Sequence, residues 1–117
     1  MFNKMQIPSV NGGVENLPFT PNSNIIQSNT ITVEKGNKVY VSGEALTKVT
    51  TNPGDTLISG LPKPSASVDI LYAIYRKDST TVTRKLTVDM SGNLKLASGE
   101  STFTYGVTWV FQVIYTV

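Results

Sequence analysis

The stretch that decides the fold is residues 67–90, SVDILYAIYRKDSTTVTRKLTVDM. From Thr80 to Met90, valine, arginine and leucine positions alternate with threonine, lysine and aspartate, which is the period of two that a β-strand imposes. Residues 67–76 alternate in the same way, and Lys77-Asp78-Ser79 between the two runs is typical of a turn. The pattern therefore predicts two long antiparallel strands joined as a hairpin.

The same signal continues on both sides of this hairpin. Residues 30–34 and 39–42 predict a shorter hairpin that ends at Gly43, and residues 46–49 and 56–59 predict two brief strands. Downstream, Ser91-Gly92-Asn93 predicts a turn into residues 94–96. Apolar residues recur nowhere at the spacing of a helix face, so we expect little or no helix. Residues 25–117 are predicted to form an antiparallel β-sandwich or jelly-roll-like domain.

The last predicted strand spans residues 107–117 and has two unlike faces. One face is apolar and the other is mixed; the apolar positions are Trp109, Phe111, Val113, Tyr115 and Val117. A strand with apolar character on both faces favours a central position in the sheet, with the mixed face against a second layer or a second subunit.

Residues 1–24 differ from the rest and are interpreted as an extended N-terminal arm or anchor. Three prolines in this run exclude a regular helix or a central strand. Apolar residues nevertheless punctuate it, and these are the candidates for subunit contact or virion anchoring: Ile7, Val10, Val14, Leu17 and Phe19. A disordered leader is the alternative, because chain ends default to disorder unless they are tied down.

Composition limits the classes of partner. The chain has 117 residues, ten basic and eight acidic, for a net charge of +2. The lysines are scattered singly, which argues against nucleic acid as a partner. No run approaches the roughly 20 apolar residues of a membrane span, and the N-terminus lacks the features of a signal peptide. The Met1 start favours a complete short protein over a fragment.

The chain lacks two residue types that often take part in catalysis and metal binding. The chain has no histidine and no cysteine, which excludes a Ser-His-Asp unit, thiolate sites and disulfides. The acidic residues stand mostly beside turns. Asp89 to Asn93 is interpreted as a hairpin turn with Asn93 at a positive φ, not as a calcium loop. We therefore expect no catalytic residues, no metal and no cofactor. A glycan depolymerase that uses two carboxylates is the enzymatic alternative.

Most aromatic residues on alternating strand positions are expected in the core. Tyr75 and Tyr105 adjoin predicted turns, so these two are the candidates for exposed ligand contacts with a sugar ring or another partner.

The order of features also resembles a known family. It runs ITVEKGNKVYVSGEA (31–45), a Pro-Gly turn, TLISGLPKP (56–64), two long alternating strands, DMSGNLKLASG (89–99) and an apolar last strand. This order is similar to that of the head domains of tailed-bacteriophage fibres and related head fibre, or virion decoration, proteins. The similarity covers about residues 30–117 and lies in structural turns, so it transfers no binding residues.

The resemblance implies a homotrimer of jelly-roll-like subunits mounted on the virion. Such a protein, made in the host cytoplasm, would act in host-surface adhesion or in attachment to the virion, with other virion proteins and host glycans as partners. A monomeric carbohydrate-binding module is the alternative function. Disulfide-free stability in so small a domain is also consistent with oligomerisation.

Overall fold

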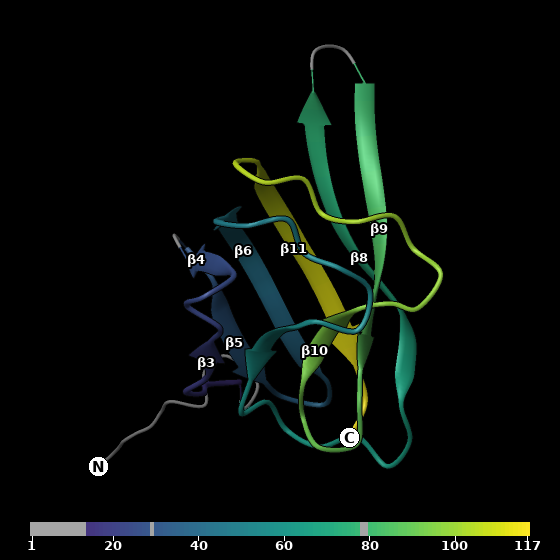
Figure 1. Cartoon of the computed structure of the whole chain (residues 1–117). Helices are drawn as coiled ribbons and strands as arrows, with labels where there is room; N and C mark the ends of the chain where they lie inside the picture. The colour runs from purple at the N-terminus through teal and green to yellow at the C-terminus, as the bar shows by residue number, and fades with distance from the viewer. Residues whose placement is uncertain (1–13, 29, 78–79) are drawn as a thin grey trace, which may run out of the picture.

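A computed structural model describes residues 14–28, 30–77 and 80–117, and these residues form an all-β, antiparallel fold (Figure 1). They contain no helix, and so none that could cross a membrane. The strands are β2 (Glu15–Asn16), β3 (Thr20–Pro21), β4 (Ile26–Ser28), β5 (Thr32–Lys35), β6 (Val39–Thr47), β7 (Thr56–Ser59), β8 (Val68–Lys77), β9 (Thr80–Val88), β10 (Leu94–Leu96) and β11 (Thr108–Tyr115). The prediction of an all-β class with little or no helix is confirmed for this part of the chain.

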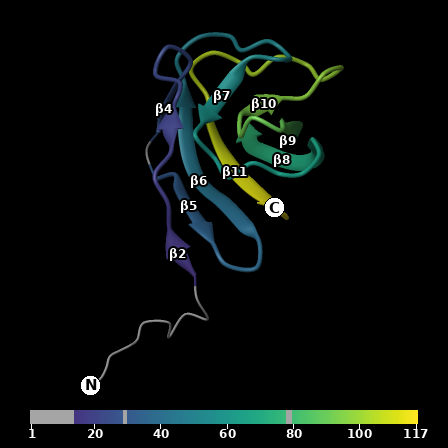
Figure 2. The same ribbon diagram turned by 90° about the horizontal axis from the view of Figure 1, so that it is seen from below.

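The ten described strands form one hydrogen-bonded sheet in the order β2-β5-β6-β11-β8-β9-β10-β7-β3, with β4 paired to β6. The sheet curls into a half-barrel, so that β5, β6 and β11 face β9, β10 and β7 across the core (Figure 2). The arrangement is sandwich-like, but its two layers belong to a single continuous sheet. β11 lies between β6 and β8, which confirms the central position predicted for the last strand.

The β8–β9 hairpin follows the predicted pattern, with one irregularity. Its register runs from Lys77 opposite Thr80 to Val68 opposite Val88, and it shifts between Val68 and Leu71. Because side chains alternate between the faces of a strand, this shift changes which residues of β8 face inward. Leu71 and Ala73 are buried, whereas Tyr72 is 42% exposed. The upper ends of β8 and β9 project beyond the neighbouring strands (Figure 1).

Residues 15–22, which we call the strap, join the two edges of the sheet. β2 pairs with β5 at one edge and β3 pairs with β7 at the other, although only residues 17–19 separate β2 from β3. The Leu17 N–H donates to the Val33 carbonyl at 2.8 Å, and the Asn22 N–H donates to the Leu57 carbonyl at 2.8 Å. An extended segment of chain therefore covers both edges, which removes backbone groups that would otherwise invite further strand pairing.

The strap lies within the predicted arm, and its proline positions suit short edge strands. Pro21 ends β3 at the edge of the sheet, where a residue without an N–H is tolerated. The division of the chain at residue 24 into an arm and a head stays a prediction, and residues 1–13 lie outside the described part.

Gly43 lies inside a strand, so the expectation that the second strand ends there is wrong. β6 continues through Gly43 to Thr47, and no separate strand forms at residues 46–49. Gly43 has a φ of 122°, and a Cβ atom there would lie 2.3 Å from the Thr30 carbonyl oxygen. Glycine is needed because the backbone of residues 30–31, between β4 and β5, runs closely alongside β6 at this point, which local sequence does not reveal.

The core fills the inside of the curl. Its largest fully buried side chains are Trp109, Phe103 and Phe111, surrounded by leucine, isoleucine and valine from the strands of both layers. Trp109, Phe111, Val113 and Tyr115 are all buried, which confirms the predicted inner face of β11. Val117, expected on the same face, is 47% exposed beyond the end of the strand.

Candidate functional site

The most exposed aromatic side chain among the described residues is that of Tyr105. It is 66% exposed and lies in the 101–107 loop, which leads into β11. Gly106, with a φ of 78°, allows the chain to turn directly after it. The sequence-based expectation that Tyr105 is an exposed residue beside a turn agrees with this placement, and its role in ligand binding stays a prediction.

Backbone hydrogen bonds hold both ends of the 101–107 loop. Phe103 and Thr51 exchange two backbone hydrogen bonds of 3.0 and 3.2 Å as an isolated bridge. Nearer the strand, the Gly106 N–H donates to the Thr47 carbonyl at 2.8 Å, and the Thr47 N–H donates to the Val107 carbonyl at 3.0 Å. The loop therefore presents Tyr105 from a defined backbone, which reduces the entropy that a binding event must overcome.

A buried aromatic cluster of Phe103, Trp109 and Phe111 anchors the same loop to the core. The Phe103 ring stacks on the Trp109 ring with centroids 4.2 Å apart, and it meets the Phe111 ring edge-on at 6.4 Å. The Arg84 guanidinium carbon lies 5.7 Å from the Trp109 ring centroid, and Arg84 Nε donates to the Thr102 carbonyl at 3.2 Å. Arg84 thus joins β9 to the loop through the hydrogen bond and to β11 through the cation–π contact.

Tyr75, the second predicted contact, belongs to β8 and pairs with Val82 of β9. The register of β8 against β11 sets Ile74 opposite Val110, so Tyr75 lies at the end of the sheet where β11 begins and the 101–107 loop emerges. The side chain of Tyr75 lies outside the described part of the structure.

The five candidate contact residues of the arm have different placements. Leu17 and Phe19 are half-buried and pack against the core of their own chain. Val14 is 37% exposed, so it is the described member of the set with a side chain open to a partner. Ile7 and Val10 lie outside the described residues.

A hollow on the outer face of the sheet was not predicted from the sequence. It has a volume of about 360 Å³ and lies over β5, β6 and β11. Its lining consists of Glu34, Tyr40, Val41, Ser42, Gln112, Val113 and Ile114. Strand pairing brings Glu34, Tyr40 and Ile114 into one row across three strands, with Ser42 and Gln112 in the next row. A mixed outer face on the last strand was recognisable in sequence, but its partners come from strands about 70 residues away.

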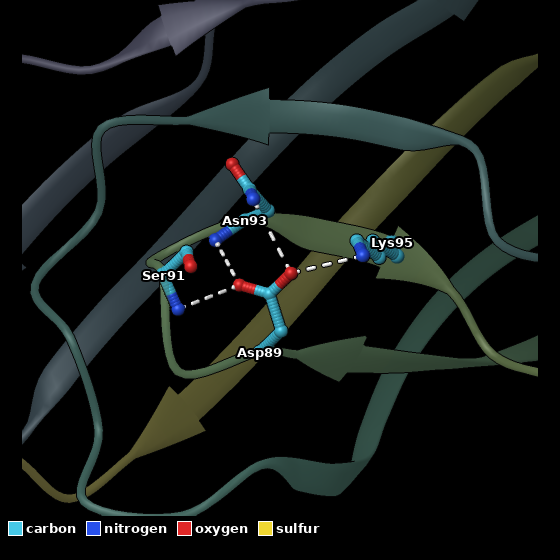
Figure 3. Close-up of polar contacts among 4 residues, drawn as sticks. All are labelled: Asp89, Ser91, Asn93 and Lys95. Carbon is cyan, nitrogen blue, oxygen red and sulfur yellow. Dashed lines mark hydrogen bonds and ion pairs between the residues drawn. The ribbon is translucent and has the colours of Figure 1, made fainter.

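The turn at residues 89–93 is held by Asp89 and has the hairpin role expected from the sequence (Figure 3). Asp89 Oδ1 accepts hydrogen bonds from the Ser91 and Asn93 N–H groups at 2.9 and 3.0 Å, and Lys95 Nζ lies 2.9 Å from Oδ2. Burial raises the pKa of Asp89, but the contacts from Lys95, Asn93 and Ser91 outweigh it and lower the pKa to about 2. The left-handed residue of this turn is Gly92. That corrects the assignment of positive φ to Asn93.

Two other carboxylates have similar structural roles. Asp55 Oδ2 accepts from the Asn52 N–H at 2.9 Å, and Glu100 Oε1 accepts from the Lys85 N–H at 2.7 Å. Among the described residues no group of three or more acidic side chains is placed to hold a metal ion. The geometry of these acids stabilises loops and turns.

Comparisons with known proteins identify a relative in fold. No protein-family model matches the chain, and no curated protein matches it. The fold is similar to that in the crystal structure of the receptor binding protein (gp15) of Listeria phage PSA, with a TM-score of 0.62 and 19% sequence identity. The similarity covers 89% of this chain and 65% of that chain, which is less than two thirds of its length. At this identity the likeness establishes a shared fold.

Proposed function

We propose that this chain is a structural protein of a bacteriophage virion that attaches the particle to its host. It would act as a short fibre or as a capsid or tail decoration protein, located on the virion. The observation that supports this most directly is the likeness in fold to a phage receptor binding protein over 89% of the chain. The order of turns in the sequence, which resembles that of phage fibre head domains, points to the same class.

The attachment site proposed here is the end of the sheet that carries Tyr105 and Tyr75. An exposed tyrosine on a fixed backbone is suited to recognition, because its ring buries a large area at small entropic cost. The 101–107 loop meets this description through its bridge to Thr51 and its hydrogen bond to Thr47. Host cell-surface glycans are the proposed partners at this end.

The chain is proposed to work by binding and not by catalysis. A general acid–base pair needs carboxylates that are free to exchange protons with a substrate. Asp89, Asp55 and Glu100 instead accept hydrogen bonds from backbone N–H groups in turns and loops. The chain also has no histidine, the most common general acid or base.

The protein is further proposed to be a homotrimer that also contacts other virion proteins. Val14, together with Ile7 and Val10, remains the proposed contact set, since Leu17 and Phe19 pack in their own core. Sedimentation equilibrium should give a mass near three times 12.7 kDa. A strictly monomeric species at micromolar concentration would overturn the trimer, and it would favour the alternative of a monomeric carbohydrate-binding module.

Attachment is tested by the binding of fluorescently labelled full-length protein to a panel of bacterial strains. We expect saturable binding to some strains, with Tyr105→Ala and Tyr75→Ala weakening it about tenfold or more. Met90→Ala is the control, because Met90 is 60% exposed in the turn that follows β9. Saturable binding that neither tyrosine variant changes would reject this site, and no saturable binding to any strain would count against the attachment function.

A further inference from the structure

The hollow on the outer face of β5, β6 and β11 has the dimensions and lining of a small ligand site. Its volume of about 360 Å³ falls within the roughly 300–1,000 Å³ of small-molecule pockets. Val41 and Val113 have side chains buried in the core, so they line the hollow with main chain. The floor is thus the hydrogen-bonded sheet itself, which is rigid before any ligand arrives.

The walls of the hollow come from residues that strand pairing sets opposite one another. Tyr40 lies opposite Ile114, and Ser42 lies opposite Gln112. Ile114 is 53% exposed and Tyr40 is half-buried, so the first pair offers an apolar wall with a phenolic hydroxyl at its edge. The small side chain of Ser42, between these larger neighbours, leaves the space of the hollow open.

The polar groups of the hollow are available for hydrogen bonding. Glu34 lies opposite Tyr40 on β5 and is half-buried. Within the described part of the chain its carboxylate has neither an ion pair nor a side-chain hydrogen bond. The Gln112 amide and the Ser42 hydroxyl lie on exposed residues of the next row. The hollow thus combines a carboxylate acceptor, an amide that both donates and accepts, and a hydroxyl.

We infer that this hollow binds a single saccharide ring. A pyranose has an apolar C–H face, which suits Tyr40 and Ile114, and a rim of hydroxyls, which suits Glu34, Ser42 and Gln112. A second copy of the chain is the competing occupant, and it would have to cover the half-buried carboxylate of Glu34. The inference rests on the proposed attachment to a glycan surface and adds a second subsite, remote from Tyr105 along β11.

The direct test is an NMR titration of the full-length protein with methyl glycosides of glucose, galactose, rhamnose and N-acetylglucosamine. Binding of one of these at millimolar concentration should shift the backbone amides of residues 34, 40–42 and 112–114. Glu34→Gln and Gln112→Leu should each weaken binding at least fivefold, and Ser42→Tyr, which fills the hollow, should abolish it. Glu44→Gln and Thr108→Tyr are the matched controls, because both residues are exposed and lie outside the hollow.

Three other results would overturn the inference, each in a recognisable way. Shifts confined to the 101–107 loop would place saccharide binding there and leave the attachment function intact. No shift with any of the four glycosides would reject the hollow as a saccharide site. A change in oligomeric mass caused by Ser42→Tyr, without saccharide shifts in the wild type, would identify this face as an interface between copies. If labelled protein fails to bind cells while hollow shifts are present, the attachment function fails and the saccharide site stands.

Discussion

Phe103 lies flat on Trp109, with ring centroids 4.2 Å apart and ring planes inclined by only 13°. Both side chains are fully buried. Because Phe103 also bridges to Thr51 through its backbone, a single residue joins the core, the turn region after β6 and the loop that carries Tyr105. The placement of the exposed Tyr105 therefore depends on Phe103, which lies two positions earlier and is fully buried.

Replacing Phe103 tests this dependence. Phe103→Ala should lower the free energy of unfolding by about 3–5 kcal/mol, because a buried aromatic ring is lost and a cavity is left. Phe103→Leu should lower the free energy of unfolding by a smaller amount. It should still raise the hydrogen-exchange rates of amides in the 101–107 loop. Urea denaturation measures the first effect. Tyr105→Ala is the control, expected to change stability by less than about 0.5 kcal/mol. Equal effects of the Phe103 and Tyr105 substitutions would contradict the anchoring role.

Gly43→Ala should destabilise the protein far more than an alanine at another left-handed glycine. At Gly43 a Cβ would lie 2.3 Å from the Thr30 carbonyl oxygen, whereas at Gly99 nothing lies within 4 Å of it. Gly99→Ala should therefore cost only the conformational strain of about 1–2 kcal/mol. Gly43→Ala should exceed this by at least about 2 kcal/mol in thermal or urea denaturation. If the two variants are equally stable, the close packing of the Thr30 backbone against Gly43 is incorrect.

The strap should contribute to stability through its half-buried side chains. Phe19→Ala should lower the free energy of unfolding by roughly 1–3 kcal/mol, because Phe19 packs against the core. Val14→Ala, at a residue that is 37% exposed, is the control and should have little effect on a monomer. If Phe19→Ala leaves the free energy of unfolding unchanged, the strap does not close the sheet in solution.

Asp89 should make stability depend on acid pH. Its pKa is lowered from 3.8 to about 2 in the folded state, so its contribution is full above pH 4 and is lost as the pH falls through 2. After allowance for solvent screening this contribution is roughly 1 kcal/mol. Asp89→Asn should remove that part of the acid dependence, as measured by urea denaturation between pH 6 and pH 2. A parallel pH profile for the variant and the wild type would show that the contacts in Figure 3 do not favour the carboxylate.

Tyr115 should make stability depend on alkaline pH. Burial raises its pKa from 10.0 to about 12, and its hydroxyl donates to the Pro62 carbonyl at 2.7 Å. A raised folded pKa gives a contribution that is full below pH 10 and is lost as the pH rises through 12. Tyr115→Phe should cost about 1 kcal/mol at pH 7, for the lost hydrogen bond. The difference between the two proteins should shrink in denaturation experiments above pH 10, and a constant difference would contradict the assignment.

Much of the secondary structure was predictable because strands impose a local period. The alternation at residues 107–117 placed Trp109 and Phe111 inward, and both are buried. The turn at residues 91–93 was predictable for a similarly local reason, since its small and polar residues tolerate a left-handed conformation, which Gly92 adopts. In β8 the prediction was incomplete, because alternation alone could not show the register shift between Val68 and Leu71.

The candidate sites likewise differ in whether local sequence could predict them. Tyr105 was recognisable from its position beside Gly106, which is a local signal. The hollow was not, because Glu34, Tyr40 and Ile114 come together only through the pairing of three strands. The partial burial of Leu17 and Phe19 could not be predicted from the sequence either, since it depends on the strap lying between β5 and β7.

The amino-acid sequence by itself determined that this chain is all β in its described part, where several of its turns fall and which side of β11 is buried. These properties follow from the two-residue period of an extended chain and from the dihedral freedom of glycine, both of which act over a few residues. Only the tertiary structure decided that one sheet curls on itself, that the strap closes it, and that the backbone at Thr30 packs closely against Gly43 of β6. Those features depend on strand register over long separations, where the gain from packing outweighs the entropy of closing long loops.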